Sequence, residues 1–113
     1  MLVPCLDEAA TIGGVVTGFR SALPGCTVYV YDNGSVDDTA RRAAEAGAVV
    51  RSEAAPGKGA VVRRMFADVD ADLYVMADGD GTYDAAQAGQ LVKQLCEDDL
   101  DMVVGARAGV TVD

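Results

Sequence analysis

The fold is decided by the stretch Leu73-Tyr74-Val75-Met76-Ala77-Asp78-Gly79-Asp80-Gly81-Thr82-Tyr83, in which a continuous apolar run ends in two aspartates. The run predicts a short buried strand, because its residues do not alternate between apolar and polar and turn residues bound it. Asp78 and Asp80 then follow the carboxyl end of that strand, where open α/β sheets place their ligands. Gly79 and Gly81 let a ligand approach the backbone closely. A loop that only turns the chain is the alternative at this point.

Strand and helix patterns alternate along the rest of the chain. Apolar runs predict further strands at residues 1–4, 27–31, 48–51 and 101–105. Apolar residues at helical spacing predict the helices between them. The expected inner positions are Ile12, Val15, Val16, Phe19 and Leu23 in the first helix, Val62, Met65, Phe66 and Val69 in the third, and Ala88, Leu91 and Leu95 in the fourth. Strands separated by helices predict a doubly wound, mainly parallel α/β sheet of the Rossmann-like kind.

Local signals mark the helix ends and one packing surface. Ser35 is expected to cap the second helix, and Asp84 the fourth. Gly13, Gly14 and Gly18 weaken the first helix relative to alanine, so we expect them to leave room for close packing.

Composition limits the class of protein. The chain of 113 residues is expected to form a single domain over 1–113. Its 18 acidic and 9 basic residues give a net charge of −9, which argues against binding to nucleic acid or to anionic membrane surfaces. The absence of histidine excludes histidine-based catalysis and the usual zinc sites. Three scattered cysteines predict reduced thiols, and no transmembrane-length or signal-peptide pattern is found, so a cytoplasmic protein is expected.

Several candidate functional groups follow predicted strands. Because the carboxyl ends of parallel strands share one edge of a sheet, these groups are expected to line a single crevice. In chain order they are Pro4 to Glu8, Asp32, Asp78 with Asp80, and Arg107.

Three of the candidates allow a structural explanation as well as a functional one. Asp32 can accept hydrogen bonds from a base or ribose, or can help to start the next helix. Glu8 can act on a ribose, or can favour a helix N-terminus through the helix dipole. Gly57-Lys58-Gly59 at a helix start can bind an anion, although it lacks P-loop spacing and a solvated turn lysine is the alternative.

Electrostatics indicates what the two aspartates require. Like charges about 4 Å apart repel by roughly 4 kcal/mol at an effective dielectric constant near 20. Asp78 and Asp80 therefore need a positive group between them and any diphosphate. Oxygen ligands without histidine favour Mg²⁺ or Mn²⁺, and such an ion stabilises a departing nucleotide diphosphate as a Lewis acid.

Four segments together resemble the family 2 glycosyltransferases, which have a GT-A fold. They occur in the family's order and at its approximate spacing, and the nearest likeness is to the polyprenyl-phosphate branch that includes dolichyl-phosphate mannosyl synthase. The resemblance covers nearly the whole chain, but only the amino-terminal, nucleotide-binding half of the family's domain. The segments are Val3 to Glu8, Asp32 to Thr39, Gly57 to Gly59, and Asp78 to Asp80.

The resemblance implies a nucleotide-sugar site. It places Pro4, Leu6 and Glu8 beside the nucleoside, Asp32 on the base and Lys58 near the nucleotide. It makes Asp78-Gly79-Asp80 the family's Asp-x-Asp motif, with Asp80 ahead of Asp78 as the direct metal ligand. Gly105-Ala106-Arg107 resembles the family's Gly-Ser-Arg segment, so Arg107 is expected on the donor phosphates.

The resemblance also bears on substrates and on what the chain lacks. The implied donor is GDP-mannose or a UDP-sugar, and the implied acceptors include a polyprenyl phosphate at the cytoplasmic face of a membrane. Asp7 replaces the family's usual asparagine, and Thr82 stands where the polyprenyl branch often has glutamine. The acceptor half is absent, so a truncated domain is expected and no catalytic base is assignable. The chain stops soon after a predicted inner strand, so an uncovered edge and self-association are expected.

Two other functions fit part of the pattern. Asp78 to Thr82 also matches the Asp-x-Asp-Gly-Thr motif of haloacid dehalogenase-type phosphatases, with Asp78 as nucleophile. That family needs a later lysine and a further acidic pair well downstream, and few residues follow Thr82 here. A non-catalytic or truncated nucleotide-sugar-binding module shares every feature of the transferase except turnover.

Overall fold

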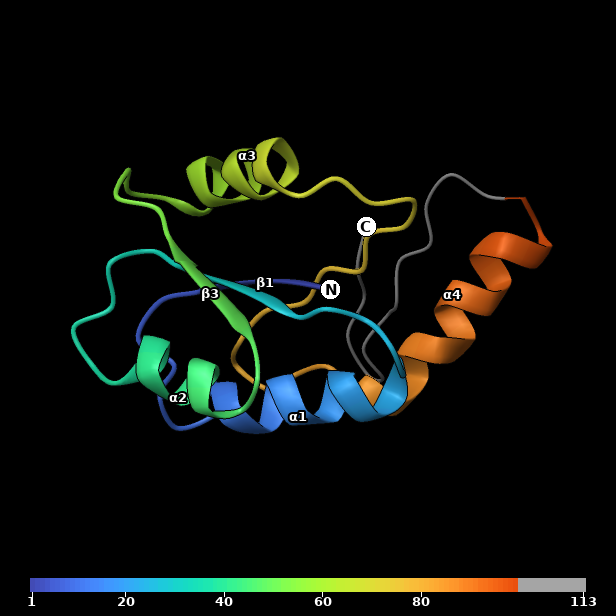
Figure 1. Ribbon diagram of the computed structural model, residues 1–113, viewed down its shortest axis with the longest axis horizontal. Helices are drawn as coiled ribbons and strands as arrows, with labels where there is room; N and C mark the ends of the chain where they lie inside the picture. The colour runs from blue at the N-terminus through green and yellow to red at the C-terminus, as the bar shows by residue number, and fades with distance from the viewer. Residues whose placement is uncertain (100–113) are drawn as a thin grey trace.

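The computed structural model describes residues 1–99 and has a parallel sheet at its centre (Figure 1). Strands β1 (Leu2–Cys5), β2 (Tyr29–Asp32) and β3 (Val49–Ser52) lie in the order β1-β2-β3. Both neighbouring pairs are parallel. The helices are α1 (Ile12–Ala22), α2 (Thr39–Glu45), α3 (Lys58–Asp68) and α4 (Ala88–Glu97), with a 3₁₀ turn, η1 (Ala85–Gln87), before α4. The predicted alternation of strands and helices is confirmed for these elements.

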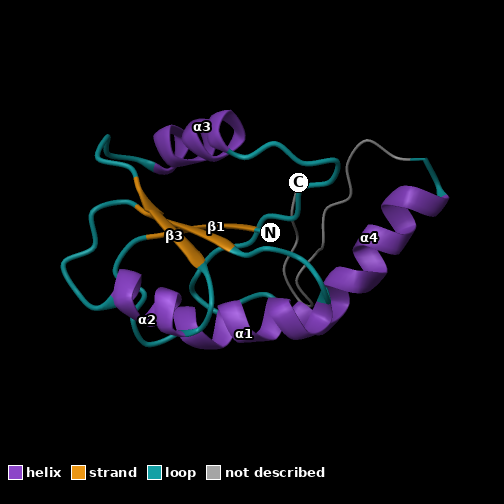
Figure 2. Ribbon diagram, in the orientation of Figure 1, coloured by secondary structure: helices purple, strands orange, loops and turns teal. Residues whose placement is uncertain are grey.

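Helices cover both faces of the sheet (Figures 1 and 2). Side chains in a strand point alternately to opposite faces, and here each face meets a different helix layer. Val3 and Val30 belong to the core beneath α1 and α2, whereas Leu2 and Tyr31 belong to the core beneath α3. The prediction of a doubly wound, parallel α/β sheet is therefore confirmed.

Polar contacts fasten α3 to the sheet. The Tyr31 hydroxyl donates to Asp68 Oδ2 at 2.9 Å, and Arg64 Nε donates to the same oxygen at 2.9 Å. The Arg64 bond lies within α3 and orients Asp68, whereas the Tyr31 bond and the burial of the apolar stripe of α3 hold the helix over β2, with its N-terminus at the carboxyl edge of the sheet.

The inner face of α3 differs from the prediction at two positions. Val61 and Met65 are buried, as is Val69 just after the helix, because residues four apart share one helix stripe. Phe66 lies off this stripe, is 48% exposed and packs edge-on against Tyr74, with ring centroids 5.0 Å apart. The assignment of Phe66 to the core was wrong, and Val61 takes the inner place.

The segment 73–77 forms less of a strand than its apolar run predicts. It runs beside β1, with a single parallel bridge between Leu2 and Met76. The Leu2 N–H donates to Val75 O at 2.7 Å, and the Ala77 N–H donates to Leu2 O at 3.2 Å. Ala77 is buried, but Met76 is 48% exposed, so the prediction of a fully buried strand was wrong.

Proline explains why the bridge does not extend into a ladder. Leu2 directs its N–H and C=O groups toward residues 75–77, and in a strand the next residue that faces the same way is Pro4. Pro4 has no N–H, so the next hydrogen bond toward this segment cannot form. The chain then turns away at Asp78. The predicted strand at 101–105 and the candidate Arg107 lie outside the described residues.

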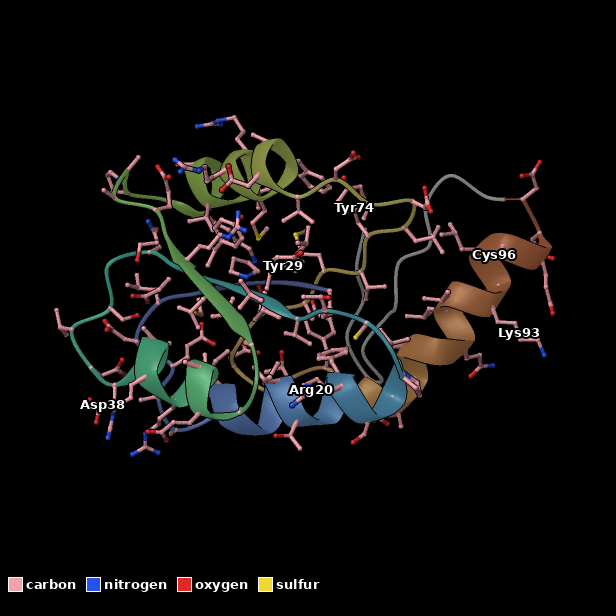
Figure 3. The ribbon with its side chains drawn as sticks, viewed as in Figure 1. Arg20, Tyr29, Asp38, Tyr74, Lys93 and Cys96 are labelled. Carbon is pink, nitrogen blue, oxygen red and sulfur yellow. The ribbon has the colours of Figure 1, made fainter. Side chains whose placement is uncertain are left out.

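The helix-end predictions have mixed outcomes. Asp84 accepts a hydrogen bond from the Ala86 N–H at 3.0 Å and so caps η1, whereas α4 itself, which it was predicted to cap, begins after Gln87. Ser35 does not cap α2, which begins after Asp38. In α4 only Ala88 is buried, and the predicted inner leucines, Leu91 and Leu95, are half-buried. Figure 3 shows exposed side chains on the outer face of α4, including Lys93 and Cys96. Within residues 1–99, no helix has the length and hydropathy needed to cross a membrane.

The helix glycines differ in their surroundings. A Cβ at Gly18 would lie 3.3 Å from Ala85 Cβ, so close packing is confirmed there. A Cβ at Gly13 or Gly14 would meet no atom within 4 Å, so the packing expectation was wrong at these two positions. Gly47, after α2, has φ +102°, and a Cβ there would collide with the Arg20 guanidinium.

Two alanine substitutions should therefore shift stability in opposite directions. Gly14→Ala should stabilise the fold by about 0.5 kcal/mol, because alanine lowers the entropy of the unfolded chain without a clash. Gly47→Ala should destabilise it by about 1 kcal/mol or more, because it forces a side chain into a left-handed backbone. Urea unfolding of both variants measures the difference. Equal stabilities would contradict the assigned backbone conformations.

Candidate functional site

A cleft of about 330 Å³ opens at the carboxyl end of β1, against the start of α3. It gathers side chains from four separate segments of the chain. Six sequence-predicted site residues line it, namely Pro4, Leu6, Glu8, Lys58, Asp78 and Asp80. Cys5 and Gly57, which belong to the candidate segments Pro4 to Glu8 and Gly57 to Gly59, line it as well, as do Asn33 and Val61, which were not singled out as site residues.

Charge is unevenly distributed in the cleft. Lys58 Nζ forms an ion pair with Asp78 Oδ1, so one aspartate of the turn is balanced. Glu8 Oε2 is buried and has no hydrogen-bond partner among the described residues. Burial raises the pKa of Glu8, and the neighbouring charges of Asp80 and Asp78 raise it further. Glu8, Asp78 and Asp80 thus lie close together at this wall, and Lys58 is paired with Asp78.

Gly79 lets the aspartate turn lie directly against Glu8. A Cβ at position 79 would lie 2.6 Å from Glu8 Oε2 and 3.1 Å from Cys5 Cβ, so no larger residue fits without movement. The sequence predicted that glycine here permits close approach to a ligand; the structure shows that it also permits close approach to the protein's own carboxylate. Within the turn, Asp80 Oδ1 accepts hydrogen bonds from Thr82 N at 3.0 Å and Thr82 Oγ1 at 2.7 Å.

The loop between β1 and α1 is held by side chains that follow β2. Three consecutive backbone N–H groups, those of Asp7, Glu8 and Ala9, all donate to this neighbouring segment. Their acceptors are, in order, Ser35 Oγ at 2.8 Å, Thr39 Oγ1 at 2.8 Å and Asp37 Oδ2 at 3.2 Å. Asp7 Oδ1 in turn accepts from the Val36 N–H at 2.8 Å. These four bonds, named here the loop clasp, fix the backbone of Glu8.

The loop clasp also explains the behaviour of two residues discussed from the sequence, Asp7 and Ser35. Asp7 has φ +53°, a left-handed conformation that aspartate and asparagine tolerate better than most residues. Ser35 accepts from Asp7 and donates to Asp32 Oδ1, so its hydroxyl joins two loops and leaves α2 without the predicted cap.

Asp32 and Asn33 occupy different positions at the end of β2. Asp32 is 9% exposed, is bonded to Ser35 and is not among the residues that line the cleft. Asn33 lines the cleft, and its Nδ2 donates to Glu53 O and Ala55 O, both at 2.8 Å. Asn33 thereby holds the loop that leads to Lys58. Asn33 lies in the segment Asp32 to Thr39 that resembles the family, but no role of its own was predicted for it from the sequence.

Cys5 lies in the cleft wall without the properties of a nucleophile. Burial, followed by the charges of Asp32, Glu8 and Asp37, raises the pKa of the Cys5 thiol to about 12. The thiol also donates to Tyr31 O at 3.6 Å. Cys5 therefore stays protonated at neutral pH and serves as a packing residue.

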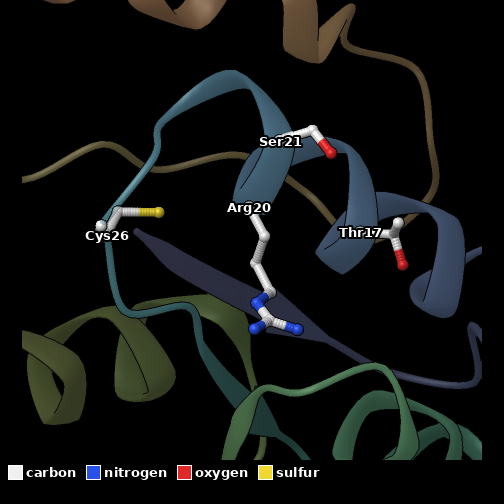
Figure 4. Close-up of a pocket in the computed structure, with 5 residues that line it drawn as sticks. Thr17, Arg20, Ser21 and Cys26 are labelled. Carbon is white, nitrogen blue, oxygen red and sulfur yellow. The ribbon is translucent and has the colours of Figure 1, made fainter.

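Two further cavities lie near α1. One, of about 360 Å³, is lined by Thr17, Arg20, Ser21, Gly25 and Cys26 (Figure 4), and Arg20 Nη1 there donates to Ala46 O at 3.0 Å. It contains none of the predicted site residues. The other, of about 330 Å³, lies on the α1 side of the aspartate turn and shares Asp78 with the cleft.

Comparison with known proteins agrees with the geometry of this cleft. The model of the family "Glycosyl transferase family 2" matches residues 1–113. Protein RfbJ of Shigella flexneri is 50% identical over 107 residues, and glycosyltransferase AglJ of Haloferax volcanii is 39% identical over 108 residues. The fold superposes with a TM-score of 0.70 and 30% identity on glucosyl-3-phosphoglycerate synthase from Mycobacterium tuberculosis, crystallised with Mg²⁺ and UDP.

The matches cover most of this chain and varying shares of the relatives. Each of the two sequence matches spans 95% of the chain, which corresponds to 83% of RfbJ but 35% of AglJ. The structural match spans 88% of the chain and 38% of the synthase. The parallel sheet has the GT-A-like arrangement of these structural neighbours, and the haloacid dehalogenase alternative gives way to this match. The chain belongs to glycosyl transferase family 2.

Proposed function

We propose that the cleft binds a nucleotide-diphosphate sugar together with a divalent cation, for transfer of the sugar to an acceptor. The observation that carries this proposal is the convergence of Glu8, Lys58, Asp78 and Asp80 on one cleft at the carboxyl end of parallel strands. Solved structures of glucosyl-3-phosphoglycerate synthase from Mycobacterium tuberculosis, which contain UDP or UDP-glucose with Mn²⁺, support a uridine nucleotide as the first donor to test. GDP-mannose is the second.

The residues of the cleft suit a hard divalent ion. Within residues 1–99, no three side chains of the metal-binding types are gathered closely enough to hold an ion by themselves. Mg²⁺ and Mn²⁺ sites of nucleotide enzymes are commonly built from one or two carboxylates plus phosphate oxygens, so a pair suffices when the nucleotide is present. We assign Asp80 as the protein ligand and Asp78 as its support. The unpartnered Glu8 Oε2 beside this turn fits a cationic neighbour.

The proposed division of roles follows the charges. When bound, the cation offsets the negative charge of the departing diphosphate. Lys58, 60% exposed at the start of α3, can turn from Asp78 toward a phosphate without unfolding any element. Pro4 and Leu6 form an apolar wall for the nucleoside, with Leu6 50% exposed. Arg107, outside the described residues, remains the proposed contact to the donor phosphates.

The acceptor is proposed only by chemical class, and the location follows from that class. The related synthase has been crystallised with phosphoglyceric acid, which makes a phosphate-bearing acceptor reasonable for this family member as well. A polyprenyl phosphate at the cytoplasmic face of a membrane is the acceptor that the sequence resemblance implies. No residue of the described chain is assigned as the base that deprotonates it.

The metal assignment predicts a specific loss in Asp80→Asn. UDP affinity in the presence of Mn²⁺ should fall about 10- to 100-fold, the range seen when groups that support a metal site are removed. Stability should change by less than about 0.5 kcal/mol, because Asp80 is exposed. Calorimetric titration with and without Mn²⁺ measures the affinity, and Asp70→Asn, another exposed aspartate, is the control. Unchanged Mn²⁺-dependent affinity in Asp80→Asn would refute the assignment.

The resemblance places Asp32 on the nucleobase of the donor. This assignment predicts that Asp32→Ala affects two ligands to different extents. UDP should be weakened more than inorganic pyrophosphate, because only UDP carries a base. Asp70→Ala, which removes an exposed carboxylate outside the cleft, is the control. If Asp32→Ala weakens both ligands equally, or weakens neither, Asp32 only supports the turn. Competition titrations with both ligands in Mn²⁺ provide the measurement.

A further inference from the structure

Thr11 makes an unusual contact for a residue that precedes a helix. It is the N-cap of α1, a position at which a threonine hydroxyl ordinarily accepts a hydrogen bond from a free helix N–H. The Thr11 hydroxyl makes no such capping bond. Its oxygen lies 2.6 Å from the carbonyl oxygen of Gly79 and 3.4 Å from that of Glu8. A hydroxyl has one proton to donate, and the shorter contact assigns it to Gly79.

The acceptor of this bond is the central residue of the aspartate turn. Gly79 separates Asp78 from Asp80, and glycine imposes few limits on its own backbone angles. The peptide unit is planar, so the direction of the Gly79 carbonyl also sets the direction of the Asp80 N–H. Without an external contact, this peptide plane could rotate and carry the Asp80 carboxylate with it.

The turn is thus constrained on two sides. The Glu8 carboxylate lies so close to Gly79 that it limits movement toward β1. The Thr11 hydroxyl holds the carbonyl from the side of α1. Because the loop clasp fixes the backbone of Glu8, three residues before Thr11, both constraints have the same rigid support.

We propose that Thr11 is a positioning residue, which orients the Asp78-Gly79-Asp80 turn for the cation and diphosphate through its bond to the Gly79 carbonyl. The inference rests on the proposed function of the cleft. Thr11 does not line that cleft, so it acts through the turn and makes no contact with the nucleotide.

The test compares two substitutions at the same position. Thr11→Val keeps the shape of the side chain and removes the hydroxyl, whereas Thr11→Ser keeps the hydroxyl. Thr17→Val makes the same chemical change at an exposed position of α1 and is the matched control. Calorimetric titration of UDP, with and without Mn²⁺, is combined with urea unfolding of every variant.

The expected result is a loss of UDP affinity in Thr11→Val alone, and only when Mn²⁺ is present. Thr11→Val should bind UDP in Mn²⁺ about fivefold more weakly than wild type, the effect of one neutral hydrogen bond. Its binding without Mn²⁺ should be unchanged. Thr11→Ser and Thr17→Val should match wild type in both conditions. Amide hydrogen exchange of the ligand-free Thr11→Val chain should be faster at residues 79–82 and unchanged in β1 to β3.

The outcomes separate this inference from the proposed function. If wild type gains affinity from Mn²⁺ and Thr11→Val gains as much, the role of Thr11 is overturned and the proposed function stands. The role of Thr11 is also overturned if Thr11→Ser loses as much affinity as Thr11→Val, or if the loss appears equally without Mn²⁺. If wild type gains no affinity from Mn²⁺, the proposed function and this inference fall together.

Discussion

Backbone hydrogen bonding at the end of β1 is the constraint on which the rest of the site depends. Where β1 ends, the N–H groups of residues 7–9 are exposed or partly buried and each has a side-chain partner, and a hydrogen bond of this kind stabilises by about 0.5–1.5 kcal/mol. The loop clasp supplies three side-chain acceptors from the segment after β2. Because the acceptors belong to another βα connection, the two loops form one unit. That unit sets the position of Glu8, the start of α1 and, through Thr11, the aspartate turn.

The same unit explains how an acidic chain can maintain a site for an acidic ligand. Glu8, Asp78 and Asp80 are held near one another by backbone geometry, although their mutual repulsion and the burial of Glu8 work against this arrangement. Lys58 offsets part of this charge through its ion pair with Asp78. Such a cluster is stabilised when a cation enters, so the repulsion that the fold tolerates in the free protein becomes a source of affinity for a metal-bound nucleotide.

The sequence predicts the helices and strands of this structure well, but it predicts poorly which side chains accept or donate hydrogen bonds between loops. Helical and strand spacing located α1, α3 and the three strands, and the strand ends brought six candidate residues to one cleft. Spacing alone did not distinguish Met65 from Phe66 or Val61 from Val62, because two adjacent apolar residues both fit a broad stripe. Ser35 and Asn33 carried recognisable turn chemistry, but their partners, Asp7 and the loop at 53–55, are distant in sequence. Contacts of that kind depend on tertiary placement, which no local pattern encodes.

The missing N–H of Pro4 has a consequence for the shape of the cleft. Two parallel chains approach to about 4.8 Å wherever a hydrogen-bond ladder joins them. Beside Leu2 the chain at 75–77 is joined in this way, but at Pro4 the attraction that would draw Asp78 against β1 is absent. No backbone hydrogen bond joins Pro4 to Asp78, and both residues line the cleft. The missing donor therefore leaves the position of Asp78 in the cleft wall to the turn that follows, whose Gly79 packs against Cys5 and Glu8.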